Sequence, residues 1–268
     1  MNADNTKGTA LVTGASGGIG AVYAERLARR GYDLVLVARN AARLDAVSAS
    51  IAGARGRSVR PVVADLSDAA DLRRIEATLR DDAAITLLVN NAGFGAATPL
   101  LSSDVARMEE MIAINVTALT RLTYAAAPAF VARGGGTIIN ISSIVALAPE
   151  VLNGVYGASK AYVLALTQSL QHELGPRGLR AQAVLPGATA TEFWNIPGVG
   201  GHENLPAEIV MTTEAMVDAA LAGLDAGEVV TIPALQDGGE WLSYEAARRA
   251  MSPHLGGATP APRYRAAS

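Results

Sequence analysis

Tyr156 and Lys160 stand four residues apart in a segment, 155–174, whose pattern predicts a helix. Residues four apart lie on the same face of a helix, so the phenol and the ammonium group are expected side by side. A free tyrosine, with a pKa of about 10, is a poor base at neutral pH, and a nearby positive charge lowers that pKa. The pair is therefore a candidate for proton exchange with a substrate, although an ordinary surface pair would have the same spacing.

Two adjacent serines, Ser142 and Ser143, follow a predicted strand at 136–141. A hydroxyl there could donate a hydrogen bond to a substrate oxygen and stabilise the negative charge that develops on it. Side chains alternate along a strand, so only one of the two serines can face the substrate. The local sequence alone leaves that choice open.

A glycine-rich segment, 13–20, reads TGASGGIG and joins a predicted strand at 9–13 to a predicted helix at 18–30. Glycine lets the backbone turn tightly and approach a pyrophosphate closely, and the start of a helix offers free N–H groups to an anion. Such a cluster can also be a plain turn. Its place between a strand and a helix favours a dinucleotide-binding loop.

The second predicted strand, 33–38, ends at Ala38 and is followed by Arg39. NAD-dependent Rossmann proteins usually carry an acidic residue at this strand end, which accepts hydrogen bonds from the ribose hydroxyls. Here no carboxylate would repel a 2′-phosphate, and the Arg39 guanidinium could bind it through two N–H groups. The strand end therefore predicts NADP(H) as the cofactor, unless Arg39 simply faces solvent.

Alternating strands and helices must position these residues. The pattern predicts strands at 9–13, 33–38, 59–64, 86–90, 136–141 and 180–185, and helices at 18–30, 41–52, 68–80, 103–132 and 155–174. Short strands separated by helices require crossover connections, which indicates a parallel sheet. We expect an α/β fold with a single Rossmann-type doubly wound parallel sheet of about seven strands and helices on both faces. The whole chain, 1–268, is expected to form one domain.

Two segments depart from this alternation of strands and helices. Residues 188–212, with several glycines and prolines and with Phe193 and Trp194, are expected to form a mobile lid over an apolar substrate pocket. Residues 253–268, rich in alanine, proline and glycine, are expected to form an irregular tail.

The composition excludes several functions. The formal net charge is −3, with 22 basic and 25 acidic residues, so we expect neither a nucleic-acid partner nor a membrane partner. There is no cysteine, and the three histidines (His172, His202, His254) lack metal-ligand spacing, so no metal is predicted. No signal peptide or membrane span is expected, and a cytoplasmic location is the default.

The ordered motifs resemble those of the short-chain dehydrogenase/reductase family, in its compact, NADP-preferring form. The glycine segment matches T-G-x-x-x-G-x-G, residues 90–93 match N-N-A-G, residues 156–160 match Y-x-x-x-K, and residues 186–191 match P-G-x-x-x-T. The resemblance covers the chain almost end to end. It implies an oxidoreductase that transfers hydride between NADP(H) and an alcohol or carbonyl substrate.

The resemblance also assigns the catalytic set as Asn115, Ser143, Tyr156 and Lys160. It selects Ser143 over Ser142 and gives Asn115 the placing of a water that links Lys160 to solvent. The implied cofactor-binding residues are Gly14, Ser16, Gly18, Ile19, Gly20, Arg39, Asp65, Leu66, Asn91, Ala92, Gly93, Tyr156, Lys160, Pro186, Gly187 and Thr191.

Alternatives and partners follow from the same comparison of motifs. The chain lacks the glycine pattern and large C-terminal domain of extended epimerases, and its Y-x-x-x-K spacing differs from that of enoyl reductases. A non-catalytic NADP-binding sensor remains the alternative from another class.

The partner is a small carbonyl or alcohol substrate. Members commonly pair the two long helices, so a homotetramer or homodimer is expected, with Leu119, Leu122, Leu164 and Leu170 on both buried and partner-facing stripes.

Overall fold

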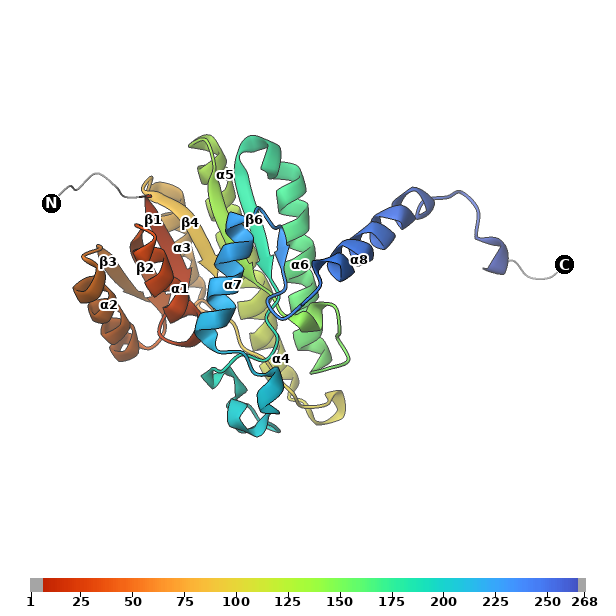
Figure 1. Cartoon of the computed structure of the whole chain (residues 1–268), viewed down its shortest axis with the longest axis horizontal. Helices are drawn as coiled ribbons and strands as arrows, with labels where there is room; N and C mark the ends of the chain where they lie inside the picture. The colour runs from red at the N-terminus through yellow and green to blue at the C-terminus, as the bar shows by residue number, and fades with distance from the viewer. Residues whose placement is uncertain (1–6, 265–268) are drawn as a thin grey trace. The chain divides into compact units, whose positions relative to one another are not determined.

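A computed structural model describes residues 7–264. Its centre is a parallel sheet of seven strands in the order β3-β2-β1-β4-β5-β6-β7 (Figure 1). The strands are β1 (Thr9–Thr13), β2 (Asp33–Ala38), β3 (Val59–Val63), β4 (Ile85–Asn90), β5 (Gly136–Ile141), β6 (Leu179–Val184) and β7 (Val230–Thr231). Six lie within a residue of the predicted positions. The seventh has only two residues, too few to show any periodicity in the sequence.

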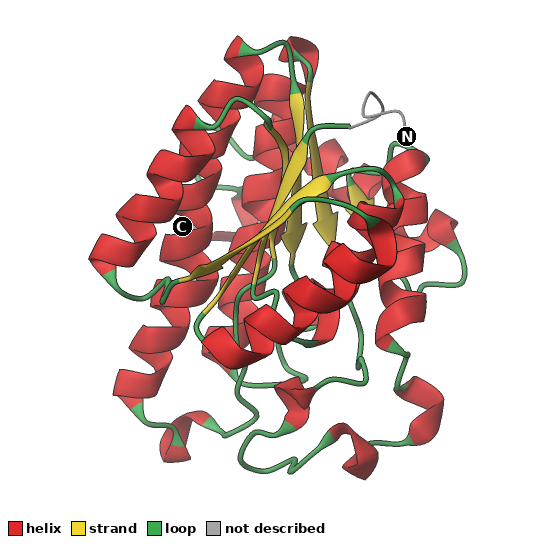
Figure 2. Ribbon diagram, turned by 90° about the vertical axis from the view of Figure 1, so that its left-hand side faces the viewer, coloured by secondary structure: helices red, strands yellow, loops and turns green. Residues whose placement is uncertain are grey.

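Helices cover both faces of the sheet (Figure 2). The core on one face includes side chains of α1 (Gly18–Arg29), α2 (Ala41–Arg55) and α7 (Thr213–Asp225). The core on the other includes side chains of α3 (Ala69–Asp81), α5 (Leu119–Ala132) and α6 (Gly154–Leu174). The predicted doubly wound α/β fold is thus confirmed.

Neighbouring residues of the central strands supply the two cores in turn. Ala10 and Val12 of β1 pack in the first core, whereas Leu11 between them packs in the second. This alternation is why the strands read as continuous apolar runs, since each face of the sheet is buried under helices.

The strand order reverses beside β1, because β2 lies on one side of it and β4 on the other. In parallel α/β sheets such a reversal opens a crevice at the carboxyl ends of the strands, where ligands bind. The glycine-rich segment follows β1, Arg39 follows β2 and Ser143 lies just beyond β5. The topology therefore brings the candidate residues to one edge of the sheet.

The helix predicted at 103–132 is interrupted. It consists of α4 (Val105–Ile112), a π-helical stretch (Ala113–Ala118) and α5. Such π stretches are rare and often mark functional sites. Asn115 lies in this stretch and is buried.

The chain divides into two compact units, Met1–Pro233 and Ala234–Ser268. The second contains α8 (Gly238–Met251), which the sequence reading did not foresee. Short 3-10 turns at Ser252–His254 and Pro262–Tyr264 follow it, and residues 265–268 of the predicted tail lie outside the described residues. The single-domain assignment stays a prediction. Within residues 7–264, no helix is long and apolar enough to cross a membrane.

Candidate active site

Tyr156 is held at the start of α6. The side chain of Asn153 caps this helix by accepting hydrogen bonds from the backbone N–H groups of Val155, at 2.9 Å, and Tyr156, at 3.4 Å. An N-cap of this kind fixes where the first helical turn begins. The Tyr156 side chain is buried, and its hydroxyl lies near Ser143, which lowers the pKa of the phenol. The cap therefore sets the position of a phenol that points at a second hydroxyl.

The structure separates the roles of the two adjacent serines. Ser142 donates a hydrogen bond to the backbone carbonyl of Lys160 at 2.7 Å, which ties the end of β5 to α6. Ser143 points the other way, toward Tyr156, and its Oγ lies 3.5 Å from the Pro186 carbonyl oxygen. The alternation of side chains thus places Ser143 where the resemblance placed it and gives Ser142 a structural contact.

Lys160 lies one helical turn beyond the tyrosine and is buried. Its Nζ donates a hydrogen bond to the Ile141 carbonyl oxygen at 2.9 Å and lies 5.7 Å from the centroid of the Tyr156 ring. Burial lowers the pKa of Lys160 to about 8, because the protein interior disfavours the charged ammonium.

The pKa of Tyr156 shifts in the opposite direction to the one expected from the sequence. Burial raises the pKa of Tyr156 to about 12, although the hydrogen bond with Ser143 works against that rise. The expectation that the Lys160 charge lowers this pKa is wrong for the structure described, because desolvation of the phenolate is the larger effect. Tyr156 therefore holds its proton at neutral pH, as a proton donor must.

Replacing Lys160 by methionine is expected to raise the melting temperature at pH 7. Below pH 8 the ammonium is charged in both the folded and unfolded states, and the shift from 10.5 to about 8 corresponds to a cost of roughly 3 kcal/mol. Losing the hydrogen bond to Ile141 offsets about 1 kcal/mol of the gain. The cost fades as the pH rises from 8 to 10.5, because the folded wild type then binds fewer protons than the unfolded chain.

Thermal unfolding of the wild type and of Lys160→Met, without cofactor, checks this at pH 7 and pH 10. The variant should be more stable at pH 7 and should lose that advantage at pH 10. A variant that is less stable by the same amount at both pH values would contradict the buried-charge account.

Asn115 fixes the loop above Lys160. Its Oδ1 accepts from the Phe94 N–H at 3.2 Å, and its Nδ2 donates to the Phe94 carbonyl at 2.9 Å and to Ser159 Oγ at 3.1 Å. A Cβ atom on Gly93 would lie 2.8 Å from Asn115 Oδ1 and 3.7 Å from Lys160 Nζ. The amide thus positions the backbone next to Lys160, and its predicted part in a water relay stays a prediction.

The glycine-rich segment forms a tight turn ahead of α1. Gly14 has a φ of 66°, which L-residues rarely adopt, and a Cβ atom on Gly20 would overlap the Gly14 carbonyl oxygen. Asn91 holds the turn from below, donating to the carbonyls of Thr13 at 2.9 Å and Gly14 at 3.3 Å. Within the described part of the chain, no side chain caps the start of α1 at Gly17, so its first N–H groups suit an anion.

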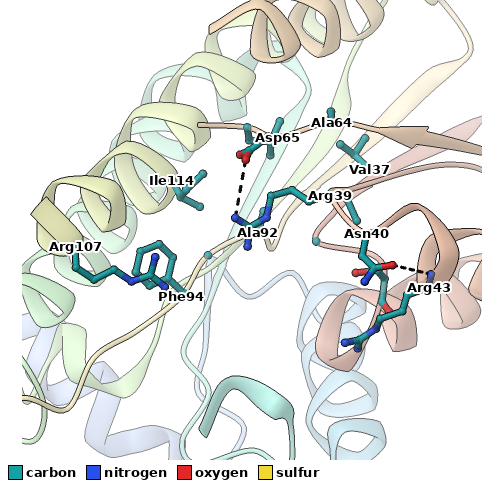
Figure 3. A pocket seen from close by; sticks show the side chains of 15 residues that line it. Val37, Arg39, Asn40, Arg43, Ala64, Asp65, Ala92, Phe94, Arg107 and Ile114 are labelled. Carbon is teal, nitrogen blue, oxygen red and sulfur yellow. Dashed lines mark hydrogen bonds and ion pairs between the residues drawn. The ribbon is translucent and has the colours of Figure 1, made fainter. Parts of the chain in front are cut away.

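A cavity of about 300 Å³ lies beside this turn (Figure 3). Seven of the predicted cofactor-binding residues line it, namely Gly14, Ser16, Arg39, Asp65, Leu66, Ala92 and Gly93. The other lining residues were not predicted to bind the cofactor, and they are Val37, Ala38, Asn40, Arg43, Ala64, Phe94, Arg107 and Ile114. Arg43 could have been found from the sequence, because it is a second arginine four residues after Arg39. Nothing in the sequence connected Arg107 with this cavity.

The other predicted cofactor residues lie outside the lining. Gly18, Ile19 and Gly20 form the first turn of α1, and Asn91 supports the glycine turn from behind. Thr191 lies against Gly18, with its Cγ2 atom 3.3 Å from a Cβ built there. Pro186 and Gly187 follow β6 beside Ser143 and Ile144, and Tyr156 and Lys160 lie at the hydroxyl pair.

Several charged side chains line the cavity. Arg39 is largely exposed, and its Nη1 lies 4.0 Å from Asp65 Oδ2. Burial alone would raise the pKa of Asp65, but hydrogen bonds from Ser67 and the charge of Arg39 lower it overall, so the carboxylate stays ionised. Arg43 donates to the Ser16 carbonyl at 3.3 Å, and Arg107 stacks over the Phe94 ring at 3.9 Å. Three arginines thus face one cavity.

An apolar cluster surrounds the tyrosine. Ala96, Met108, Met111, Val145 and Tyr156 are buried together, and Phe94, Leu152, Val155 and Phe193 pack against them. The hydroxyl pair of Ser143 and Tyr156 therefore borders an apolar environment on one side. Such a site suits a polar group on an otherwise apolar small molecule.

Comparisons with known proteins agree with this geometry. A family model described as short chain dehydrogenase matches residues 8–196. The chain is similar to a solved short-chain dehydrogenase from Sphingobium yanoikuyae in complex with NADPH, with 48% identity, a TM-score of 0.93 and coverage of 96% of this chain and 100% of that one. It is also similar to the bulky-bulky ketone specific alcohol dehydrogenase from Comamonas testosteroni, with 41% identity, a TM-score of 0.89 and coverage of 97% and 99%.

A curated relative is the very-long-chain 3-oxoacyl-CoA reductase of Anas platyrhynchos. It is 35% identical over 192 residues, which cover 70% of this chain and 61% of that protein. The match therefore spans less than two thirds of the relative's length.

Proposed function

The chain belongs to the short-chain dehydrogenase family and is an oxidoreductase, and on that premise we propose that it uses NADP(H) to reduce a hydrophobic ketone or aldehyde. The observation that carries the proposal is the buried group of Ser143, Tyr156 and Lys160, which lies at the border of an apolar cluster. A carbonyl oxygen placed between two hydroxyl donors is polarised, and the apolar cluster suits the rest of such a molecule.

The residues around the cavity fit the cofactor. Arg39 and Arg43 follow a strand that ends without a carboxylate, which suits an adenosine that carries a 2′-phosphate. The uncapped start of α1 suits the pyrophosphate. When bound, NADPH supplies the hydride. The similar dehydrogenase from Sphingobium yanoikuyae, solved with NADPH, supports the same assignment.

The chain's own groups handle the proton. Tyr156 holds its proton at neutral pH and donates it to the substrate oxygen, while Ser143 donates a hydrogen bond to the same oxygen. Lys160 lies one helical turn beyond Tyr156, with its Nζ held by the Ile141 carbonyl oxygen, and the Asn115 amide holds the adjoining loop in place.

A panel of ketones and aldehydes tests the proposal, with the fall in NADPH absorbance as the measurement. Steady oxidation with apolar carbonyls is expected, and steady oxidation with bulky ketones in particular, as the name of the Comamonas testosteroni relative suggests. Binding of NADPH without turnover on any member of the panel would favour the alternative, a cofactor-binding sensor. The complete set of Ser143, Tyr156 and Lys160 argues against that alternative.

The remaining expectations about assembly and location stay proposals. Leu119, Leu122, Leu164 and Leu170 are all buried within this chain, so they leave no stripe for a partner. The homotetramer or homodimer is instead supported by Ile112, Tyr124 and Tyr162, which the long helices expose. Light scattering at micromolar concentration measures the assembly. The cytoplasmic location stays a prediction.

A further inference from the structure

Phe193 inserts an aromatic ring beside the catalytic tyrosine. It belongs to a 3-10 turn, Glu192–Trp194, in the segment after β6. Its ring centroid lies 5.6 Å from that of Tyr156, with the rings tilted by 44°. The ring packs in the apolar cluster that also holds Met108, Met111 and Val145. A side chain from the predicted lid therefore lies within the site itself.

Gly95 makes room for this ring. A Cβ atom at this position would overlap the Phe193 Cζ atom and would lie 2.8 Å from its Cε2 atom. Gly95 is not among the glycines with positive φ in residues 7–264, so its backbone does not require glycine. What the absent side chain provides is a notch that accepts the edge of the Phe193 ring.

The turn that carries Phe193 is anchored on both sides. Trp194 packs edge-on against Phe193 at 5.2 Å, is buried, and donates its indole N–H to the Thr189 carbonyl at 3.0 Å. Glu192 forms an ion pair with Arg43 at 2.7 Å. With its neighbours fixed, the Phe193 side chain can leave its position by rotating about its own bonds, without opening of the whole segment.

We propose that Phe193 is the specificity-determining residue of the site, and this rests on the proposed carbonyl reduction. Its ring fills the subsite next to Tyr156 that a ring-sized apolar substituent of a ketone occupies, with Gly95 as the floor of that subsite. An aromatic or alicyclic group that takes this place restores the apolar contacts that the Phe193 ring gives up. When the substituent is small, the Phe193 ring stays in place and keeps those contacts. Phe193 therefore limits how readily the site accepts a ketone with a ring-sized group on this side.

Phe193→Ala tests the proposal, with kcat/KM measured for an aryl ketone that has a second bulky substituent and for the corresponding methyl ketone. Removing the ring should raise the ratio of bulky to small substrate by about ten-fold or more, chiefly through KM, because the bulky group no longer displaces a packed side chain. Ile209→Ala changes an exposed residue of the same segment and should leave the ratio unchanged. An unchanged ratio in Phe193→Ala would overturn the proposal.

Gly95→Ala provides a second, independent arm. The added methyl group should change KM for the bulky ketone several-fold while Phe193 is present, and by less than about two-fold in the Phe193→Ala background, since the two side chains then no longer collide. If the effects of Gly95→Ala and Phe193→Ala on KM were additive, the proposed contact between the two residues would be refuted. A wild type that reduces no ketone would instead contradict the proposed function, so the two failures are distinguishable.

Discussion

Tyr156→Phe is expected to lower kcat by about 10³- to 10⁴-fold while the protein stays folded and binds NADPH. Proton transfer by a positioned side chain contributes about 10²- to 10⁴-fold, and Tyr156 also polarises the carbonyl, so the loss should fall near the top of that range. The phenylalanine ring keeps the apolar contacts of the tyrosine within its cluster, including the contact with Phe193. Only the acidic proton and its hydrogen bond with Ser143 are removed.

Tyr162→Phe is the matched control. Tyr162 lies on the same helix, is more exposed than Tyr156, and its hydroxyl pairs with Thr120 at 2.8 Å. This change should leave kcat within about two-fold, because the Tyr162 hydroxyl pairs with Thr120 and lies outside the catalytic set. Single-turnover reduction of a reactive ketone, together with melting temperature and NADPH titration, separates the two variants. If Tyr156→Phe retains a tenth of the wild-type rate while folded, another group donates the proton.

The main elements were predictable because their periodicity is strong. Strands such as β2 are continuous apolar runs, and the helices between them have enough length to show a pattern. The misses have local causes. β7 has two residues, and α7, which was not predicted either, directly follows the segment 188–212 that was assigned to a lid. α8 lies in a part of the chain where exposed apolar residues such as Leu242 and Met251 blur the helical pattern. The side chain of Asn115, in the π-helical stretch, bonds to Phe94 in a separate loop, and no local pattern reveals such a tertiary contact.

The residues of the candidate site likewise divide into those that the sequence predicted and those that it did not. Tyr156 and Lys160 were placed by helical spacing, and the Gly14 turn by its position between a strand and a helix. The direction of the Tyr156 pKa shift was not accessible, because it depends on burial by residues distant in the sequence. Arg107 also reaches the site from a remote segment, and for Phe193 the sequence predicted a place in the lid but not the contact with Tyr156. Their roles follow from packing, and packing is what a single sequence specifies least directly.

The wild type is expected to favour NADP(H) over NAD(H) by at least about ten-fold in kcat/KM, and Ala38→Asp combined with Arg39→Ala is expected to reverse that order. A hydrogen bond to a charged group contributes roughly 1.5–3 kcal/mol, or about ten- to 150-fold in affinity. Arg39 lines the cavity with its guanidinium largely exposed, and among residues 7–264 its ion pair is a 4.0 Å contact to Asp65, so it is available to a phosphate. An aspartate at position 38 restores the carboxylate that accepts from ribose hydroxyls and repels a 2′-phosphate.

The second cavity arginine determines how complete the reversal is. Arg43 is already paired with Glu192 at 2.7 Å and bonded to the Ser16 carbonyl, so it is less free than Arg39 to bind a phosphate. Arg39→Ala alone should therefore reduce the preference, and the added aspartate should invert it by charge repulsion. Arg80→Ala, which removes an exposed arginine of α3 paired with Asp81, should leave the preference unchanged. A wild type that prefers NADH, or a double variant that still prefers NADPH, would show that the end of β2 does not select the cofactor.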